Sequence, residues 1–133
     1  LIEGLRVVLA TGEEGDGSGN IVDQDMYAAV YSYGPVSFGY QNTDRTPDST
    51  SSALNTDRTQ MSVAFNVNED LSVSYGEIDV EVEGQSFDHE MSGIQIAYSM
   101  GSMSLRVQRN TGDNMVASGD EYQRTELELN FAF

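Results

Sequence analysis

The sequence predicts an all-β chain that forms an antiparallel, up-and-down transmembrane β-barrel with about eight strands. Three observations predict this class. Apolar and polar residues alternate with a period of two in one segment after another. The connections alternate between tight turns and long polar segments, and most acidic residues gather beside the long segments. Short turns at one end and long loops at the other are typical of barrels that cross a membrane.

Eight segments carry the alternation. They are residues 4–12, 25–33, 35–43, 58–67, 70–82, 90–101, 102–110 and 121–133. Segment 4–12 places Arg6 on its polar face. Segment 25–33 is ambiguous, because Tyr27 and Tyr31 on one face compete with Met26 and Val30 on the other. No segment has a sustained period of 3.6, so we expect no helix.

The third and fourth segments are clearer. In 35–43, Val36, Phe38 and Tyr40 lie opposite Ser37, Gly39 and Gln41. In 58–67, Met61, Val63, Phe65 and Val67 lie opposite Ser62, Ala64 and Asn66. Both patterns predict strands with one face in an apolar medium and the other in water.

The second half of the chain repeats this pattern. Apolar residues share one face in the three segments before the last; they are Leu71, Val73, Tyr75, Ile94, Ile96, Tyr98, Met100, Met103, Leu105 and Val107. In the last segment, Leu127, Leu129 and Phe131 share a face opposite Glu126 and Glu128. No stretch of about 18 apolar residues is present, so a transmembrane helix is not expected.

The connections sort into two kinds. The long polar segments are 13–24, 44–57, 83–89 and 111–120. The tight turns are centred on Gly34-Pro35, Asn68-Glu69 and Gly101-Ser102. Because the two kinds strictly alternate, all long loops are predicted at one end of the barrel and all tight turns at the other.

The charge of the chain is strongly negative, at −16, with six Arg, no Lys and no Cys. This balance argues against a nucleic-acid partner, since such a partner requires cations at its phosphates. Most acids fall within 12–25, 42–58, 77–90 and 110–121, beside the long segments. A bilayer would impose this sorting, because a charge on the lipid face costs about 2–4 kcal/mol at the midplane.

The end of the chain, Tyr122 to Phe133 (YQRTELELNFAF), resembles the C-terminal signature of bacterial outer-membrane barrels. Together with the Ser-, Gly- and Tyr-rich strands before it, it is similar to the end of general porins of the alphaproteobacterial type. The resemblance covers the whole chain in pattern but is specific only in the last dozen residues. It implies that Leu129, Phe131 and Phe133 close the barrel and are read by the barrel-insertion machinery.

Such porins have sixteen strands and form trimers. The resemblance therefore implies that residues 1–133 are a single outer-membrane barrel domain or fragment, the C-terminal half of a homotrimeric porin. It also implies an outer-membrane location with a periplasmic C-terminus and extracellular long loops. The expected function is a passive aqueous channel for small hydrophilic solutes and ions, in contact with lipid and lipopolysaccharide.

The polar faces of the strands are the candidate pore wall. The residues expected to line it are Arg6, Gln95, Arg106, Gln108, Arg124, Glu126 and Glu128. The arginines could form a basic strip that faces acids across the lumen and sets ion preference. Alternatively, Arg106 and Arg124 could simply pair with Glu126 and Glu128. Arg45, Arg58 and Arg109 are expected in or near loops, in solvent.

The run Glu77, Asp79, Glu81 and Glu83 is a candidate metal site. Because Leu71, Val73 and Tyr75 face lipid, strict alternation would also turn these acids outward. Either a bulge near Gly76 flips the face, or the strand has left the hydrocarbon and the acids lie at the headgroups. In the second case they could share Ca²⁺ or Mg²⁺ with lipopolysaccharide phosphates. No cofactor other than Ca²⁺ at this acidic rim is expected.

No pair of nucleophile and base is evident, because His89 is the only His and lies in an acidic segment without a G-x-S-x-G turn. We therefore expect no enzymatic activity. The main alternative is a complete eight-stranded barrel that acts as an anchor or adhesin without a conducting pore. A soluble lipocalin-type barrel would have an apolar interior and a polar exterior, the reverse of the arrangement that the terminal stripe of Phe indicates.

Overall fold

Eight β-strands make up the chain in a computed structural model, which describes residues 2–15, 21–48 and 54–132. The strands are β1 (Leu5–Gly15), β2 (Ile21–Tyr33), β3 (Val36–Pro47), β4 (Thr56–Asn66), β5 (Leu71–Val82), β6 (His89–Met100), β7 (Met103–Asp113) and β8 (Glu121–Phe131). Within these ranges no helix is long and apolar enough to span a membrane. The prediction of an all-β, antiparallel up-and-down arrangement is confirmed.

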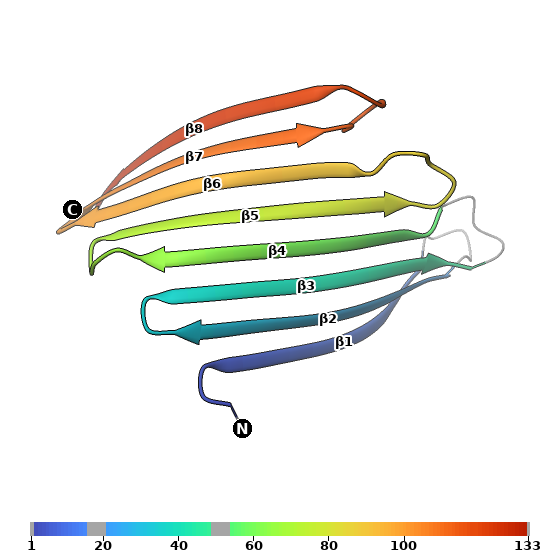
Figure 1. Cartoon of the computed structure of the whole chain (residues 1–133), viewed down its shortest axis with the longest axis horizontal. Coiled ribbons are helices and arrows are strands. Elements are labelled where there is room, and N and C mark those ends of the chain that lie inside the picture. Colours follow the sequence, from blue (N-terminus) through green and yellow to red (C-terminus); the bar gives the residue numbers. More distant parts are fainter. Residues whose placement is uncertain (1, 16–20, 49–53, 133) are drawn as a thin grey trace.

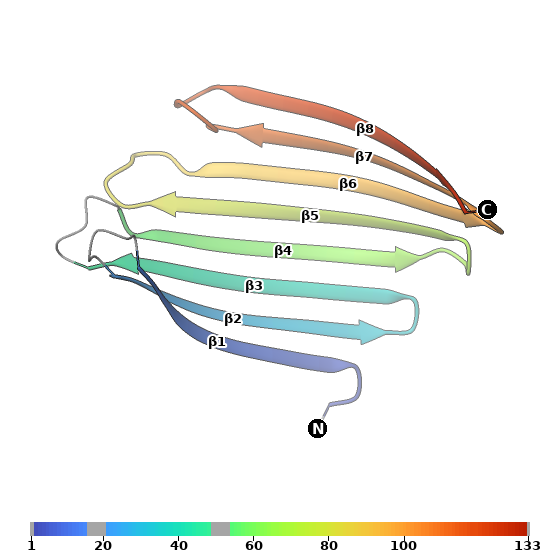
Figure 2. The same cartoon turned by 180° about the vertical axis from the view of Figure 1, so that it is seen from behind.

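The strands form one curved sheet in sequence order, and each pairs antiparallel with its neighbours in the chain (Figure 1). The described parts of β1 and β8 pair only with β2 and β7. These two strands lie at opposite sides of the sheet in both views (Figures 1 and 2). Within the described residues the eight strands therefore do not close on themselves, which does not favour the alternative of a complete eight-stranded barrel.

The tight turns lie at one end of the sheet and the long connections at the other (Figure 1). Gly34, in the turn between β2 and β3, and Gly101, in the turn between β6 and β7, have φ values of 54° and 59°. A residue without Cβ takes this left-handed conformation at little cost, which explains glycine at both positions. The predicted alternation of connection lengths is confirmed.

The strands extend further toward the long-connection end than the alternation of apolar residues indicates. β1 runs to Gly15, β2 begins at Ile21 and β3 runs to Pro47, so many acids expected in loops lie in strands. Conversely, β8 ends at Phe131, two residues before its predicted end. Backbone pairing continues where the apolar pattern has stopped, because the ladder requires hydrogen bonds between strands but no apolar side chains.

The register defines two faces of the sheet, since residues directly opposite each other point to the same side. One row runs Arg6, Val30, Gly39, Ser62, Gly76, Gly93, Asn110 and Arg124. Most residues that line the main cavity belong to this row or to other rows whose side chains point to the same side of the sheet. We call this side the hollow face. The opposite side is the outer face.

The outer face carries an apolar band of exposed side chains. Its members include Leu5, Val7, Leu9, Tyr31, Tyr33, Phe38, Phe65, Tyr75, Ile94, Ile96, Met100, Leu127, Leu129 and Phe131. Leu9 is 77% exposed and Leu127 is 70% exposed. Val22 is the single buried hydrophobic residue among those described, so this sheet has no conventional core. A band of this size needs an apolar medium around it, and the ambiguous β2 turns its tyrosines toward that band.

Candidate functional site: the hollow face

Small and polar side chains cover the middle of the hollow face. The cavity there has a volume of about 620 Å³ and draws its lining from β2 to β8. Gly39, Ser62, Gly76, Gly93 and Asn110 cross it from strand to strand. A Cβ at Gly93 would lie 2.5 Å from Oδ1 of Asn110, and one at Gly39 would lie 2.6 Å from Oγ of Ser62. Glycine therefore makes room for the polar side chain beside it.

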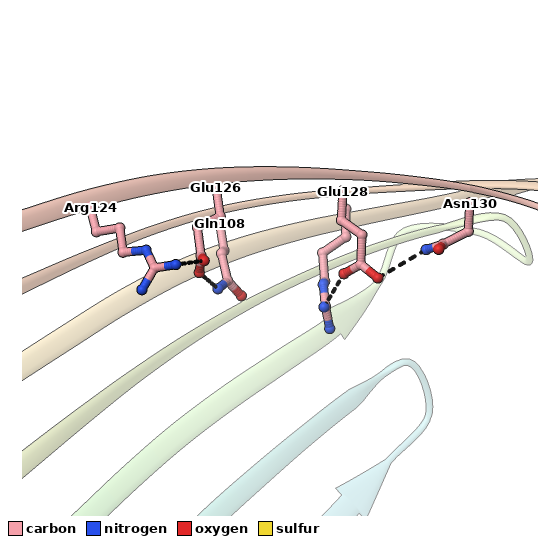
Figure 3. Close-up of polar contacts among 6 residues, drawn as sticks. Gln108, Arg124, Glu126, Glu128 and Asn130 are labelled. Carbon is pink, nitrogen blue, oxygen red and sulfur yellow. Dashed lines mark hydrogen bonds and ion pairs between the residues drawn. The ribbon is translucent and has the colours of Figure 1, made fainter.

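Arg106 and Arg124 form local ion pairs on the hollow face. The guanidinium of Arg106 on β7 donates to the carboxylate of Glu128, its direct partner on β8. Arg124 pairs with Glu126 two residues further along β8, and the amide of Gln108 also donates to Glu126. Figure 3 shows Gln108, Arg124, Glu126, Glu128 and Asn130 on one side of β7 and β8. The amide of Asn130 donates to the carboxylate of Glu128 over 3.1 Å. This arrangement favours local pairing over arginines aimed across the lumen.

The remaining predicted wall residues share this face. Gln95 on β6 lies directly opposite Gln108, so both amides point to the same side. Arg6 on β1 lies at the far side of the sheet from β8. Among the described residues, no carboxylate lies within 4 Å of the Arg6 guanidinium. Six of the seven candidates thus lie on the neighbouring strands β6, β7 and β8, and Arg6 lies on β1. Five of the six form two adjacent rows across these strands, and Arg124 lies in the next row, which Arg6 shares.

Two further arginines, expected in or near loops and in solvent, lie in strands near the long connections. Arg45 lies on β3 and Arg58 on β4, both on the hollow face. Arg45 forms an ion pair with Glu14 over 3.5 Å, and Gln24 donates to the same carboxylate over 3.0 Å. The sequence alternation could have placed both on this face, because Arg45 lies an even number of residues from Gln41 in β3, and Arg58 an even number from Gln60 in β4. Arg109 lies on the outer face and donates to Gln123 over 2.9 Å.

Charges in the strands separate by face. The hollow face carries five of the six arginines and three glutamates, namely Arg6, Arg45, Arg58, Arg106, Arg124, Glu14, Glu126 and Glu128. The outer face carries Arg109 and the remaining strand carboxylates, namely Glu13, Asp23, Asp25, Asp44, Asp57, Glu77, Asp79, Glu81, Glu90, Asp113 and Glu121. The wall of the hollow is therefore net positive in a chain that is net negative.

The acidic run on β5 keeps its parity. The β4–β5 register is unbroken from Thr56↔Val82 to Asn66↔Ser72, so no bulge flips the face near Gly76. Glu77, Asp79 and Glu81 therefore point outward, beyond the apolar band, and the first of the two accounts is wrong. Glu83 follows the end of β5. On the hollow face beside them lie Ile78, Val80 and Val82. Toward the long connections, the outer face of β5 therefore becomes acidic and its hollow face becomes apolar.

Asp79 and Glu81 align with acids of neighbouring strands, whereas Glu77 lies between Met61 on β4 and Ser92 on β6. Asp25, Asp44, Asp57 and Glu81 are successive direct partners across β2 to β5. Asp79, Glu90, Asp113 and Glu121 are successive partners across β5 to β8. We call these two rows the carboxylate ladders. Among the described residues, no group of three or more His, Cys, Asp or Glu side chains is close enough to hold a metal ion.

Asn42 donates hydrogen bonds to one member of the first carboxylate ladder. Its amide donates to both carboxylate oxygens of Asp57, over 2.8 and 3.1 Å. Asn42 is the one buried polar residue among those described, at 9% exposure. Among the described residues, the other members of the ladder form no ion pair, and like charges directly opposite each other destabilise a sheet.

The C-terminal candidates Leu129 and Phe131 lie on the outer face of β8. Leu129 pairs with Leu105, and Phe131 with Met103, so both extend the apolar band to the tight-turn end. Phe133 lies outside the described residues. His89, expected in a loop, is the first residue of β6. Its Nδ1 contacts the carbonyl oxygen of Asn114, and its ring packs edge-on against Phe87 at 5.7 Å.

The comparisons with known proteins add a likeness in three dimensions. The structure of outer-membrane expressed OmpT of Vibrio cholerae superposes with a TM-score of 0.68, at 13% sequence identity. The chain has the fold of an outer-membrane β-barrel. The match covers 98% of this chain and 53% of the other, so the chain spans about half the length of that neighbour. No family model and no curated protein matches the sequence.

This likeness corrects the expectation that the chain has no enzymatic activity. That expectation treated the absence of a recognisable nucleophile–base pair as evidence against an enzyme, and the likeness to this neighbour contradicts it. At 13% identity the likeness establishes the fold alone, and one fold hosts catalytic and non-catalytic functions. Local sequence motifs detect only the catalytic sites whose residues lie close together in the chain, which is why the exclusion went too far.

Proposed function

We propose that the chain forms part of an outer-membrane porin, a passive aqueous channel for small hydrophilic solutes and ions. The observation that carries the proposal is the contrast between the two faces. The outer face presents an exposed apolar band, whereas the hollow face presents Gly, Ser, Gln, Asn and charged side chains, with apolar residues such as Val30 and Ile78 among them. Lipid suits the first face and water suits the second.

The open edges of the sheet support a barrel wider than eight strands. An eight-stranded barrel is just filled by its own side chains, whereas one of about 16 strands keeps an aqueous channel. The unpaired sides of β1 and β8 leave room for further strands. The structural neighbour, of which this chain matches 53%, is consistent with a barrel of about twice this size. In this proposal the porin is a homotrimer.

The proposed orientation follows from the two ends of the sheet. The long connections would face the exterior, and the tight turns and the C-terminus the periplasm. Leu129, Phe131 and Phe133 would be read by the insertion machinery. Long loops are tolerated on the exterior of such barrels, and tight turns are typical of the periplasmic side.

Planar-bilayer recording tests the proposal, using protein extracted from its native membrane. We expect large, stable conductance steps that arrive in groups of three. A protein that inserts and gives no steps would contradict the channel and favour a closed barrel that acts as an anchor or adhesin.

We also propose that Ca²⁺ or Mg²⁺ at the acidic rim joins the outer face to lipopolysaccharide phosphates. The carboxylate ladders support this role. Hard divalent cations prefer carboxylate oxygens, and each ladder places four carboxylates in one row without an arginine. Lipid phosphates would supply the ligands that the protein alone does not gather around one point.

A further inference from the structure

The charge of the hollow face has the opposite sign to that of the chain. The whole chain carries −16, and the outer face accounts for most of the strand carboxylates. The hollow face carries five arginines against three glutamates. Composition alone would predict a wall that attracts cations, and the separation of charges by face reverses that expectation.

Three of the five arginines are neutralised one to one. Arg45 pairs with Glu14, Arg106 with Glu128 and Arg124 with Glu126. These pairs use all three glutamates of the hollow face. Arg6 and Arg58 remain, and among the described residues neither guanidinium has a carboxylate within 4 Å. The net positive charge of the wall therefore comes from these two side chains.

Within the part of the chain that the structure describes, the direct neighbours of Arg6 and Arg58 do not compensate their charges. Arg6 lies opposite Val30 on β2. Arg58 lies between Thr43 on β3 and Val80 on β5, and the next residue in its row is His89. None of these side chains carries a negative charge.

The outer-face carboxylates contribute little to the potential inside the hollow. By the register their side chains point to the other side of the sheet; Glu77 also borders the cavity, and its carboxylate accepts a hydrogen bond from the hydroxyl of Tyr75 on the outer face. At an ionic strength of 0.1 M, exposed charges are screened over about 10 Å. A solute in the hollow therefore responds more strongly to the charges on the hollow face than to the outer-face carboxylates.

We propose that the pore wall formed by this chain favours small anions, and that Arg6 and Arg58 set this preference. The inference rests on the proposed channel function and adds the class of solute. Rings of arginine or lysine side chains are the usual means by which pores select anions. Here the preference comes from two arginines that have no acidic partner among the described residues, on a wall whose other charges cancel.

Reversal potentials across a KCl gradient test the inference in planar bilayers that contain the full protein. Arg6→Gln and Arg58→Gln should each lower the ratio of chloride to potassium permeability by roughly twofold. This is the effect expected when one charge acts on an ion across about 10 Å of water that contains screening salt. The double variant should lower the ratio further. Arg58→Lys keeps the charge and should keep the preference.

Arg109→Gln is the matched control, because it removes one arginine from the outer face of β7 and should leave the ratio unchanged. Channels that conduct but show the same ratio in Arg6→Gln, Arg58→Gln and Arg109→Gln would overturn this inference and leave the channel function intact. Protein that inserts without conducting would overturn the channel function and the inference together.

Discussion

At the residue scale, the side on which a side chain lies determines which medium it meets. Gln95 and Ile96 are neighbours on β6, yet Gln95 lies beside Gln108 on the hollow face and Ile96 lies beside Val107 on the outer face. Ile96 is also flanked by Val73 on β5. It therefore lies within the apolar band, where lipid would surround it.

Ile96→Arg should destabilise the folded protein by about 2–4 kcal/mol, because it places a charge on the lipid face near the midplane. Gln95→Arg, the matched control, should change stability far less, since its guanidinium meets water and the carboxylate of Glu126 two strands away. Denaturant titration in lipid vesicles measures both. Equal losses in the two variants would contradict the assignment of the faces.

At the element scale, the sequence indicates the existence and the order of the strands well and their ends less well. All eight predicted segments are strands, because lipid on one side and water on the other impose alternation inside the bilayer. The alternation disappears where β1, β2, β3 and β7 leave the apolar medium, although their ladders continue. That is why acids such as Asp23 and Asp44 were expected in loops and lie in strands.

The same limit explains which parts of the site the sequence missed. Arg45 lies beyond the predicted end of its strand at residue 43, so its side of the sheet became visible only once that extension was known. Arg58 begins the predicted segment 58–67, and the alternation of that segment already places it on the face of Ser62. The pairing of Asp25 with Asp44, and of Asp44 with Asp57, depends on register between strands. Register is set by contacts across strands, which the period of a single strand does not reveal.

Removal of divalent cations should lower the thermal stability of the protein in lipopolysaccharide-containing membranes. Asp44 has a like charge on either side, each pair costing up to about 1 kcal/mol without a cation. Asp44→Asn should therefore raise stability in chelator and reduce the difference that chelator makes. Glu69→Gln, in a tight turn at the other end, is the control and should behave like the unmodified protein. Stability and lipid association that do not respond to chelator would contradict the cation role.

At the scale of the whole molecule, the sheet separates three environments. In the proposed porin, the apolar band would meet lipid, the carboxylate ladders would meet the headgroups and the exterior, and the hollow face would meet water. The described residues bury one hydrophobic side chain, so stability must come from backbone pairing between strands and from the surrounding lipid rather than from a protein core. The unpaired edges of β1 and β8 fit a wider barrel, in which these strands would find partners.

Cysteine scanning along β6 tests the central claim most directly, because the chain has no cysteine of its own. Single cysteines at 94, 95, 96 and 97 would be treated in lipid vesicles with a membrane-impermeant thiol reagent. We predict that Gln95→Cys and Ala97→Cys react while Ile94→Cys and Ile96→Cys are protected. Equal reactivity at all four positions, or the reverse alternation, would contradict a wall with lipid on its outer face and water on its hollow face.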